Sequence, residues 1–258
     1  MSHSKEIEIY TAKNIKKESN DTFSLEITLD NQKFHLPIIN VGTTEHPEYI
    51  AILDPRSPEL GIAGANVLAE FLKKLKIDLI ITAPSSKSEQ MIQEANIKAE
   101  LENQPIIILG GSTQENGQKH IYTKDEVVKL ASPNGETYWI EECRPITLGP
   151  NDPSKFFAIN EETLEKIINL IQQGKNIAFV DDVYSSGATI NSLKKLISKA
   201  LLDKQISVPT IPIIVVARES LASDEIFNNQ ETLIADNEAL NLYASILIPV
   251  LAEIPETE

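Results

Sequence analysis

Two adjacent carboxylates followed by a hydroxyl-rich loop form the segment of this chain best suited to chemistry. Asp181 and Asp182 follow the apolar run 177–180, and the loop after them runs from Tyr184 to Thr189. Backbone N–H groups and hydroxyls at the start of a helix can hold a phosphate, and paired carboxylates can accept hydrogen bonds from sugar hydroxyls. The pattern therefore predicts a site for a phosphorylated sugar of the ribose 5-phosphate kind.

A loop that only caps the following helix is the alternative for this segment, because serine and threonine are good capping residues. Capping needs one such residue, whereas the carboxylate pair, two serines and Gly187 occur together here. Gly187 allows positive φ or a close approach of the backbone to a phosphate. The loop lacks the spacing of both Gly-x-x-x-x-Gly-Lys-Ser/Thr and Gly-x-Gly-x-x-Gly, so these two nucleotide-binding patterns are excluded.

The elements that must position this segment alternate between apolar strands and amphipathic helices. The predicted strands are 79–81, 105–109, 177–180, 211–217 and 244–251, the last of them at a sheet edge. The predicted helices are 60–75, 89–101, 161–173 and 189–202. Apolar strands separated by helices are typical of a parallel α/β sheet that is buried on both faces. We therefore expect one α/β domain over residues 1–258.

Two further segments could cover the site. Apolar residues alternate over 22–39, which predicts an antiparallel hairpin that could form a small hood with 217–227. Turn signals over about 110–156 predict a β flap with short strands at 119–122, 127–130 and 137–142. We interpret this irregular stretch as a mobile flap, and a surface hairpin without function is the alternative.

Charge and composition limit the possible partners. The chain carries 23 Lys+Arg against 38 Asp+Glu, a net charge of −15, which disfavours binding to nucleic acid or to a membrane surface. Cys143 is the only cysteine, so it predicts a buried thiol rather than a disulfide or a Cys-rich zinc site. The sequence shows no secretory signal and no bilayer-spanning run, so we expect a cytoplasmic protein.

The sequence Phe179-Val-Asp-Asp-Val-Tyr-Ser-Ser-Gly-Ala-Thr189 resembles the signature of the type I phosphoribosyltransferases. The resemblance implies a parallel α/β core, under a hood, that binds 5-phosphoribosyl 1-diphosphate with Mg²⁺. It implies that Asp181 and Asp182 bind the ribose hydroxyls and meet the metal only through the bound donor. The remaining substrate-binding residues that it implies here are Val183, Tyr184, Ser185, Ser186, Gly187, Ala188 and Thr189.

Weaker similarity upstream points to the adenine phosphoribosyltransferase branch. Residues 54–80 resemble that branch's approach to its first core strand, and Ser85, Ser86 and Lys87 would form the pyrophosphate loop. Lys87 stands where the branch commonly has arginine, and a lysine contacts a diphosphate as a point charge without a bidentate fork. A solvated surface lysine is the alternative for Lys87.

In the expected flap, Tyr138-Trp139-Ile140-Glu141 resembles the Tyr-x-Leu-Glu of that branch, whose glutamate lies beside the base. The resemblance implies that Glu141 is the catalytic group that takes a proton as a ring nitrogen attacks C1 of the sugar. An exposed strand glutamate is the alternative. The chain departs from the family after Leu109, where Gly110-Gly111-Ser112 replaces the usual basic residues and Lys119 is the nearest cation.

The resemblance as a whole implies a homodimeric enzyme of purine salvage. It would transfer phosphoribosyl from the diphosphate donor to a purine and release pyrophosphate, and adenine is the favoured purine. A non-catalytic sensor or regulator of the same fold is the alternative, and a transferase for pyrimidine, xanthine or another acceptor is a third hypothesis. Because Lys87 is the main fixed cation near the loop, we expect anion binding to depend on backbone amides, a helix N-terminus and Mg²⁺.

Overall fold

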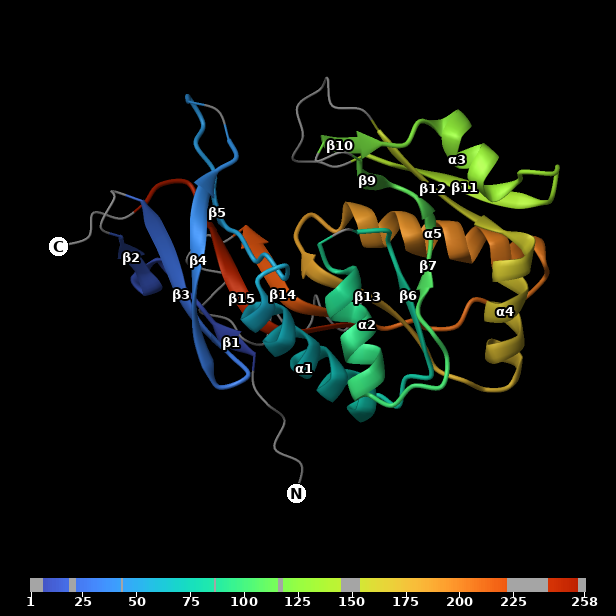
Figure 1. The fold of residues 1–258 in the computed structure, drawn as a ribbon, viewed down its shortest axis with the longest axis horizontal. Coiled ribbons are helices and arrows are strands. Elements are labelled where there is room, and N and C mark those ends of the chain that lie inside the picture. The colour runs from blue at the N-terminus through green and yellow to red at the C-terminus, as the bar shows by residue number, and fades with distance from the viewer. Residues whose placement is uncertain are drawn as a thin grey trace.

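The computed structural model describes residues 7–18, 22–42, 44–85, 87–115, 118–144, 154–221 and 241–254 (Figure 1). The helices are the 3-10 turn η1 (Ala12–Asn14), α1 (Pro58–Lys74), α2 (Glu89–Lys98), α3 (Lys124–Ala131), α4 (Glu161–Gln172) and α5 (Ala188–Asp203). The strands are β1 (Glu8–Ile9), β2 (Ile15–Lys17), β3 (Phe23–Leu29), β4 (Gln32–Asn40), β5 (Tyr49–Ala51), β6 (Leu79–Thr82), β7 (Ile106–Ile107), β8 (Leu109–Gly110), β9 (Ser112–Glu115), β10 (Gln118–Ile121), β11 (Tyr138–Cys143), β12 (Lys155–Asn160), β13 (Ile177–Tyr184), β14 (Ile213–Leu221) and β15 (Leu242–Leu251).

The main sheet joins a parallel core to an antiparallel extension. Its order is β2-β3-β4-β5-β15-β14-β13-β6-β7, and β1 pairs with β15. Strand pairs from β15 to β7 are parallel, whereas those from β2 to β15 are antiparallel. The predicted α/β class is therefore confirmed, with the hairpin predicted over 22–39 present as β3 and β4.

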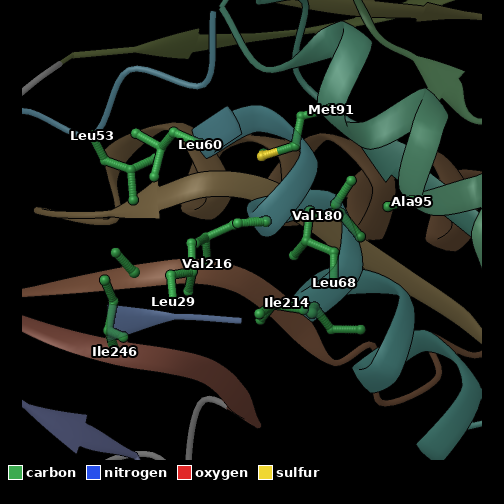
Figure 2. Close-up of a cluster of buried hydrophobic side chains, with 14 of the residues drawn as sticks. Leu29, Leu53, Leu60, Leu68, Met91, Ala95, Val180, Ile214, Val216 and Ile246 are labelled. Carbon is green, nitrogen blue, oxygen red and sulfur yellow. The ribbon is translucent and has the colours of Figure 1, made fainter. Parts of the chain in front are cut away.

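The two faces of the parallel core carry separate hydrophobic clusters, because alternate strand residues point to opposite sides. Helices α1 and α2 pack on one face, where Leu68 and Met91 meet Val180 and Val216 (Figure 2). Helices α4 and α5 pack on the other face, where Phe179 is fully buried. Burial on both faces explains why the sequence of these strands is almost continuously apolar.

Local cap chemistry sets several helix boundaries close to their predicted positions. Ser57 precedes Pro58 at the start of α1, and proline is favoured there because its missing N–H is unpaired anyway. Asn160 accepts a hydrogen bond from the Thr163 N–H at 3.0 Å, which confirms the predicted cap of α4. No described helix is both long and apolar enough to cross a membrane.

Two predictions of secondary structure were wrong. The segment 127–130 lies in α3 and not in a strand, because Thr123 and Glu126 form a capping box that starts a helix there. Strand β15 is not at an edge, since β14 and β5 both pair with it and β1 joins it as well. A short apolar run does not distinguish helix from strand or edge from centre by itself.

The region expected to form a β flap has mixed structure. It holds the β9/β10 hairpin, helix α3 and a three-stranded sheet of β11, β12 and β8. The Trp139 ring N–H donates to the Asp203 carboxylate at 2.7 Å, which joins β11 to α5. Figure 1 shows this unit over α5, on the side of the molecule away from β2 to β4. Residues 145–153 and 222–227, parts of the expected flap and hood, lie outside the described residues.

Candidate functional site

The carboxyl ends of β6 and β13 form the topological switch point of the parallel core. From β6 the chain enters α2 on one face and continues to β7, whereas from β13 it enters α5 on the other face and continues to β14. Ligands of open α/β sheets bind in the crevice that such diverging connections leave. The two predicted loops, 85–87 and 185–189, both begin at this crevice.

A cavity of about 470 Å³ lies at this switch point. Among the predicted site residues, those that line it are Ser85, Lys87, Asp181, Asp182, Val183, Ser185 and Thr189. The structure therefore brings together two loops that are about a hundred residues apart in the sequence. The side chains of Ile50, Leu53 and Phe157 add apolar walls.

The carboxylate pair is fixed by the backbone that follows it. Asp181 accepts a hydrogen bond from the Asp182 N–H at 2.9 Å, and Asp182 accepts one from the Val183 N–H at 3.0 Å. Burial, and then the charge of Asp182, raise the pKa of the Asp181 carboxyl well above its usual range. The cavity therefore presents two adjacent carboxyl groups, of which Asp181 is the more buried.

Two cations, one after β5 and one after β6, reach this cavity. The Lys87 Nζ lies 3.7 Å from the Asp182 carboxylate, and the Lys87 side chain is 42% exposed. Arg56 also lines the cavity and binds Asp54 through a fork, with Nε and Nη2 at 2.8 and 2.6 Å from the two carboxylate oxygens. This fork lowers the pKa of the Asp54 carboxyl, so Asp54 stays ionised beside the site.

Lysines from the flap region complete the cationic lining. Lys119 on β10 and Lys155 on β12 both line the cavity. The Lys155 side chain is partly buried, which lowers the pKa of its ammonium group, and the charge of Lys119 lowers it further. Sequence reasoning named Lys119 but missed Lys155 and Arg56, because no local pattern marks a lysine on β12 or an arginine before α1 as facing this crevice.

A third carboxyl group faces the cavity from β14. Glu219 lines it, and burial together with the charge of Asp182 raises the pKa of the Glu219 carboxyl to about 7. Glu219 was also missed, since it stands one residue beyond Arg218, the last β14 residue paired with β13. Only the relative lengths of the two strands show that it reaches the carboxyl edge.

The stability of the protein is expected to fall with rising pH on account of Glu219. A raised folded-state pKa favours folding fully below the unfolded value of 4.5, and this contribution is lost as the pH rises through about 7. The unfolding free energy of Glu219→Gln should therefore rise relative to that of wild type as the pH increases. The difference between variant and wild type should be about 2–3 kcal/mol larger at pH 8 than at pH 4.5. Urea denaturation at both pH values checks this, with the exposed Glu165→Gln as control; a pH-independent difference would refute it.

The loop after the carboxylates turns sharply against the buried ring of Tyr184. Gly187 has a φ of +74°, and a Cβ built on it would lie 2.3 Å from the Tyr184 hydroxyl oxygen. Tyr184 is 8% exposed and belongs to the α5-side cluster, so its side chain supports the loop from below. Ser186 accepts a hydrogen bond from the Ala188 N–H at 3.4 Å, and Gly187 is the N-cap residue of α5.

Replacing Gly187 by alanine should destabilise the protein more than left-handed backbone strain alone explains. Gly174 provides a matched control, because its φ is +73° and a Cβ there meets nothing within 4 Å. Gly174→Ala should cost about 1–2 kcal/mol of unfolding free energy, and Gly187→Ala at least about 1 kcal/mol more, since Tyr184 must move. Chemical denaturation of both variants measures this, and equal losses would show that the ring does not restrict the loop.

The remaining predicted residues lie elsewhere. Among the described residues, Glu141 is not one of those that line the cavity; it pairs with Phe157, which does. Tyr184, Gly187, Ala188 and Ser186 form the base of the loop and the start of α5. Ser86 lies outside the described residues. Cys143 is a free, buried thiol, as predicted.

The donor set at the cavity fits Mg²⁺ only together with a ligand. Among the residues that the structure describes, no group of three or more His, Cys, Asp or Glu side chains comes together as a metal site. Mg²⁺ takes six oxygen ligands and usually completes its shell with water and substrate phosphates. Asp181 and Asp182 are hard oxygen donors, so they suit a Mg²⁺ ion that arrives with phosphate oxygens.

Known structures of related architecture resemble this chain at low sequence identity. Adenine phosphoribosyltransferase from Rhodothermus marinus has a TM-score of 0.41 and 10% identity, and the match covers 91% of this chain and 94% of that one. The Giardia lamblia enzyme complexed with 9-deazaadenine has a TM-score of 0.41 and 10% identity, over 75% and 82%. A hypoxanthine phosphoribosyltransferase from Staphylococcus aureus has a TM-score of 0.36 and 11% identity, over 74% of each chain.

No protein-family model and no curated protein matches the sequence.

Proposed function

We propose that the chain is a phosphoribosyltransferase that uses 5-phosphoribosyl 1-diphosphate as donor and a purine as acceptor. Adenine is the leading candidate among the purines. One observation carries the proposal: the carboxylate pair and the hydroxyls of Ser185 and Thr189 line one cavity at the switch point, with Lys87 on the facing loop. Asp181 and Asp182 suit the ribose hydroxyls, and the start of α5 suits the 5-phosphate. Lys87 suits the diphosphate.

The reaction needs positioning and charge more than covalent help from the protein. A ring nitrogen of the base attacks C1 of the ribose, the C1–O bond to the diphosphate breaks, and pyrophosphate leaves with that electron pair. The proton that the base nitrogen loses passes to a carboxylate, for which Glu141 is our candidate. The carboxylate then releases this proton to solvent. Mg²⁺, when bound with the donor, would neutralise the charge of the leaving pyrophosphate.

Four cations around the cavity support anion binding by this acidic chain. Its charged lining comprises Arg56, Lys87, Lys119 and Lys155 against Asp181, Asp182 and Glu219. Burial raises the pKa of two of these carboxyls, Asp181 and Glu219, and that of Glu219 is raised to about 7. Lys119 and Lys155 supply cations where the segment after Leu109 has none, and they suit the diphosphate group as point charges.

A donor-binding sensor of the same fold is the second candidate. It is favoured by the position of Glu141, which is not among the described residues that line the cavity. Under either candidate the donor binds at the carboxylate pair. We further propose that the enzyme acts in nucleotide salvage as a cytoplasmic homodimer.

Turnover with a panel of acceptors tests the enzyme proposal. Purified protein is incubated with 5-phosphoribosyl 1-diphosphate, Mg²⁺ and one base at a time, and both nucleotide and pyrophosphate are quantified. Adenine should give both products in equal amounts. Donor binding without product from any base would refute the enzyme and support the sensor. The variant Glu141→Gln should lower kcat for adenine by about a hundredfold if Glu141 accepts the proton.

A further inference from the structure

Glu219 stands where the polar part of the cavity meets its apolar part. Strand β14 lies next to β13 on the side away from β6, so Glu219 is separated from the β6 loop by the carboxylate pair. The neighbouring strand β15 pairs with β5, from which residues 50–53 continue along the cavity wall. The lining therefore changes from lysine and serine after β6, through aspartate on β13, to Glu219 on β14 and the apolar residues 50–53, which Arg56 follows.

Glu219 and Lys155 line the cavity from different strands, Glu219 from β14 and Lys155 from β12. Glu219 interacts with Asp182, with Lys87 and with Glu48 ahead of β5. Lys155 interacts instead with Lys119 and Asp181. The cation whose charge acts on Glu219 is Lys87, and the Lys87 Nζ pairs with Asp182 at 3.7 Å, so the Glu219 carboxyl can accept a hydrogen bond from a ligand.

We propose that Glu219 selects the acceptor by accepting a hydrogen bond from an amino group of a flat nitrogen heterocycle, an inference that rests on the proposed function. The apolar residues 50–53 suit the faces and edges of such a ring, and the carboxyl oxygen suits its amino N–H. A buried polar group that loses its partner is costly, so a ring without the amino group would bind poorly. The Glu219 carboxyl can accept this hydrogen bond in both protonation states, since each keeps an oxygen acceptor.

Ligand binding by equilibrium titration tests this selection without requiring turnover. Adenine and its near-isostere 6-methylpurine, which has a methyl group in place of the amino group, are titrated into full-length protein with ribose 5-phosphate present. Wild type should bind adenine about tenfold or more tightly than 6-methylpurine. Glu219→Leu should reduce this preference to within about threefold, and Glu219→Gln should keep it because the amide oxygen still accepts an N–H.

Glu48→Leu is the matched control, since it removes a carboxylate near Glu219 that is not part of the described cavity lining. It should leave the adenine preference unchanged. A wild type without preference, or without binding of either purine, would overturn the inference, as would a Glu219→Leu variant that keeps the preference. Titration of 5-phosphoribosyl 1-diphosphate with Mg²⁺ into the same samples separates acceptor selection by Glu219 from the proposed phosphoribosyl transfer. If wild type does not bind the donor but keeps its preference for adenine, only the proposed function is rejected.

Discussion

Replacing Asp181 and Asp182 together by asparagine should weaken binding of 5-phosphoribosyl 1-diphosphate by about a hundredfold or more. Hydrogen bonds from hydroxyls to a carboxylate are stronger than those to a neutral amide, by about 1–2 kcal/mol each, and the double change removes two such acceptors. The local backbone conformation should be retained, because an asparagine side-chain oxygen can still accept these hydrogen bonds. They come from the N–H of residue 182 and the N–H of Val183. Calorimetric titration of the donor with Mg²⁺ measures the effect.

Stability provides the control for this double variant. Because burial raises the pKa of Asp181, its ionised form opposes folding at neutral pH, so a neutral amide should leave the free energy of unfolding unchanged or increased. Asp125→Asn, at an exposed position of α3, should change neither affinity nor stability appreciably. Donor affinity that survives the double replacement would refute the assignment of the carboxylate pair.

Replacing Lys155 by methionine should weaken donor binding by about tenfold to a hundredfold. The described residues include no carboxylate in an ion pair with Lys155, although its side chain is partly buried and faces the cavity. An unpaired buried cation is costly to keep, and a bound anion compensates for that cost. Removing the charge should therefore stabilise the free protein by about 1 kcal/mol while it lowers the affinity for the diphosphate donor.

Salt dependence distinguishes Lys155 from a merely structural lysine. Donor affinity of wild type should fall as the ionic strength rises, and this dependence should be smaller in Lys155→Met. Lys129→Met, which removes an exposed lysine of α3, provides the matched control and should retain the wild-type dependence. A Lys155→Met variant with unchanged affinity at low salt would show that this lysine has no part in anion binding.

The sequence contained enough local information to predict the α/β class, the hydroxyl-rich loop and the carboxylate pair. These features depend on short-range patterns: continuous apolar strands, the cap at Asn160 and the residues 181–189. Helix α3 was not predicted, although Thr123 and Glu126 have capping-box spacing. The segment 127–130 is rich in apolar residues, and this pattern also fits a strand. The capping box is the local signal that identifies this segment as a helix.

Lys155 and Glu219 illustrate what the sequence could not provide. Their place in the cavity depends on which strands are neighbours and on how far each one extends. Strand β12 reaches the site through pairing with β8, and β14 extends past the end of β13. Such pairings are non-local, so no pattern of residues around position 155 or 219 predicts them. The same assembly explains how a chain of net charge −15 gathers four cations around one cavity.

Equilibrium binding of 5-phosphoribosyl 1-diphosphate to the wild-type protein tests the central claim most directly. The account predicts saturable binding of one donor molecule per chain in the presence of Mg²⁺, with competition by ribose 5-phosphate and by pyrophosphate. Each competitor should displace the donor in the absence of the other competitor, because the donor fills both ends of the cavity. The sugar phosphate occupies one end and the diphosphate the other. The absence of saturable donor binding, or binding that neither competitor reduces, would contradict the account.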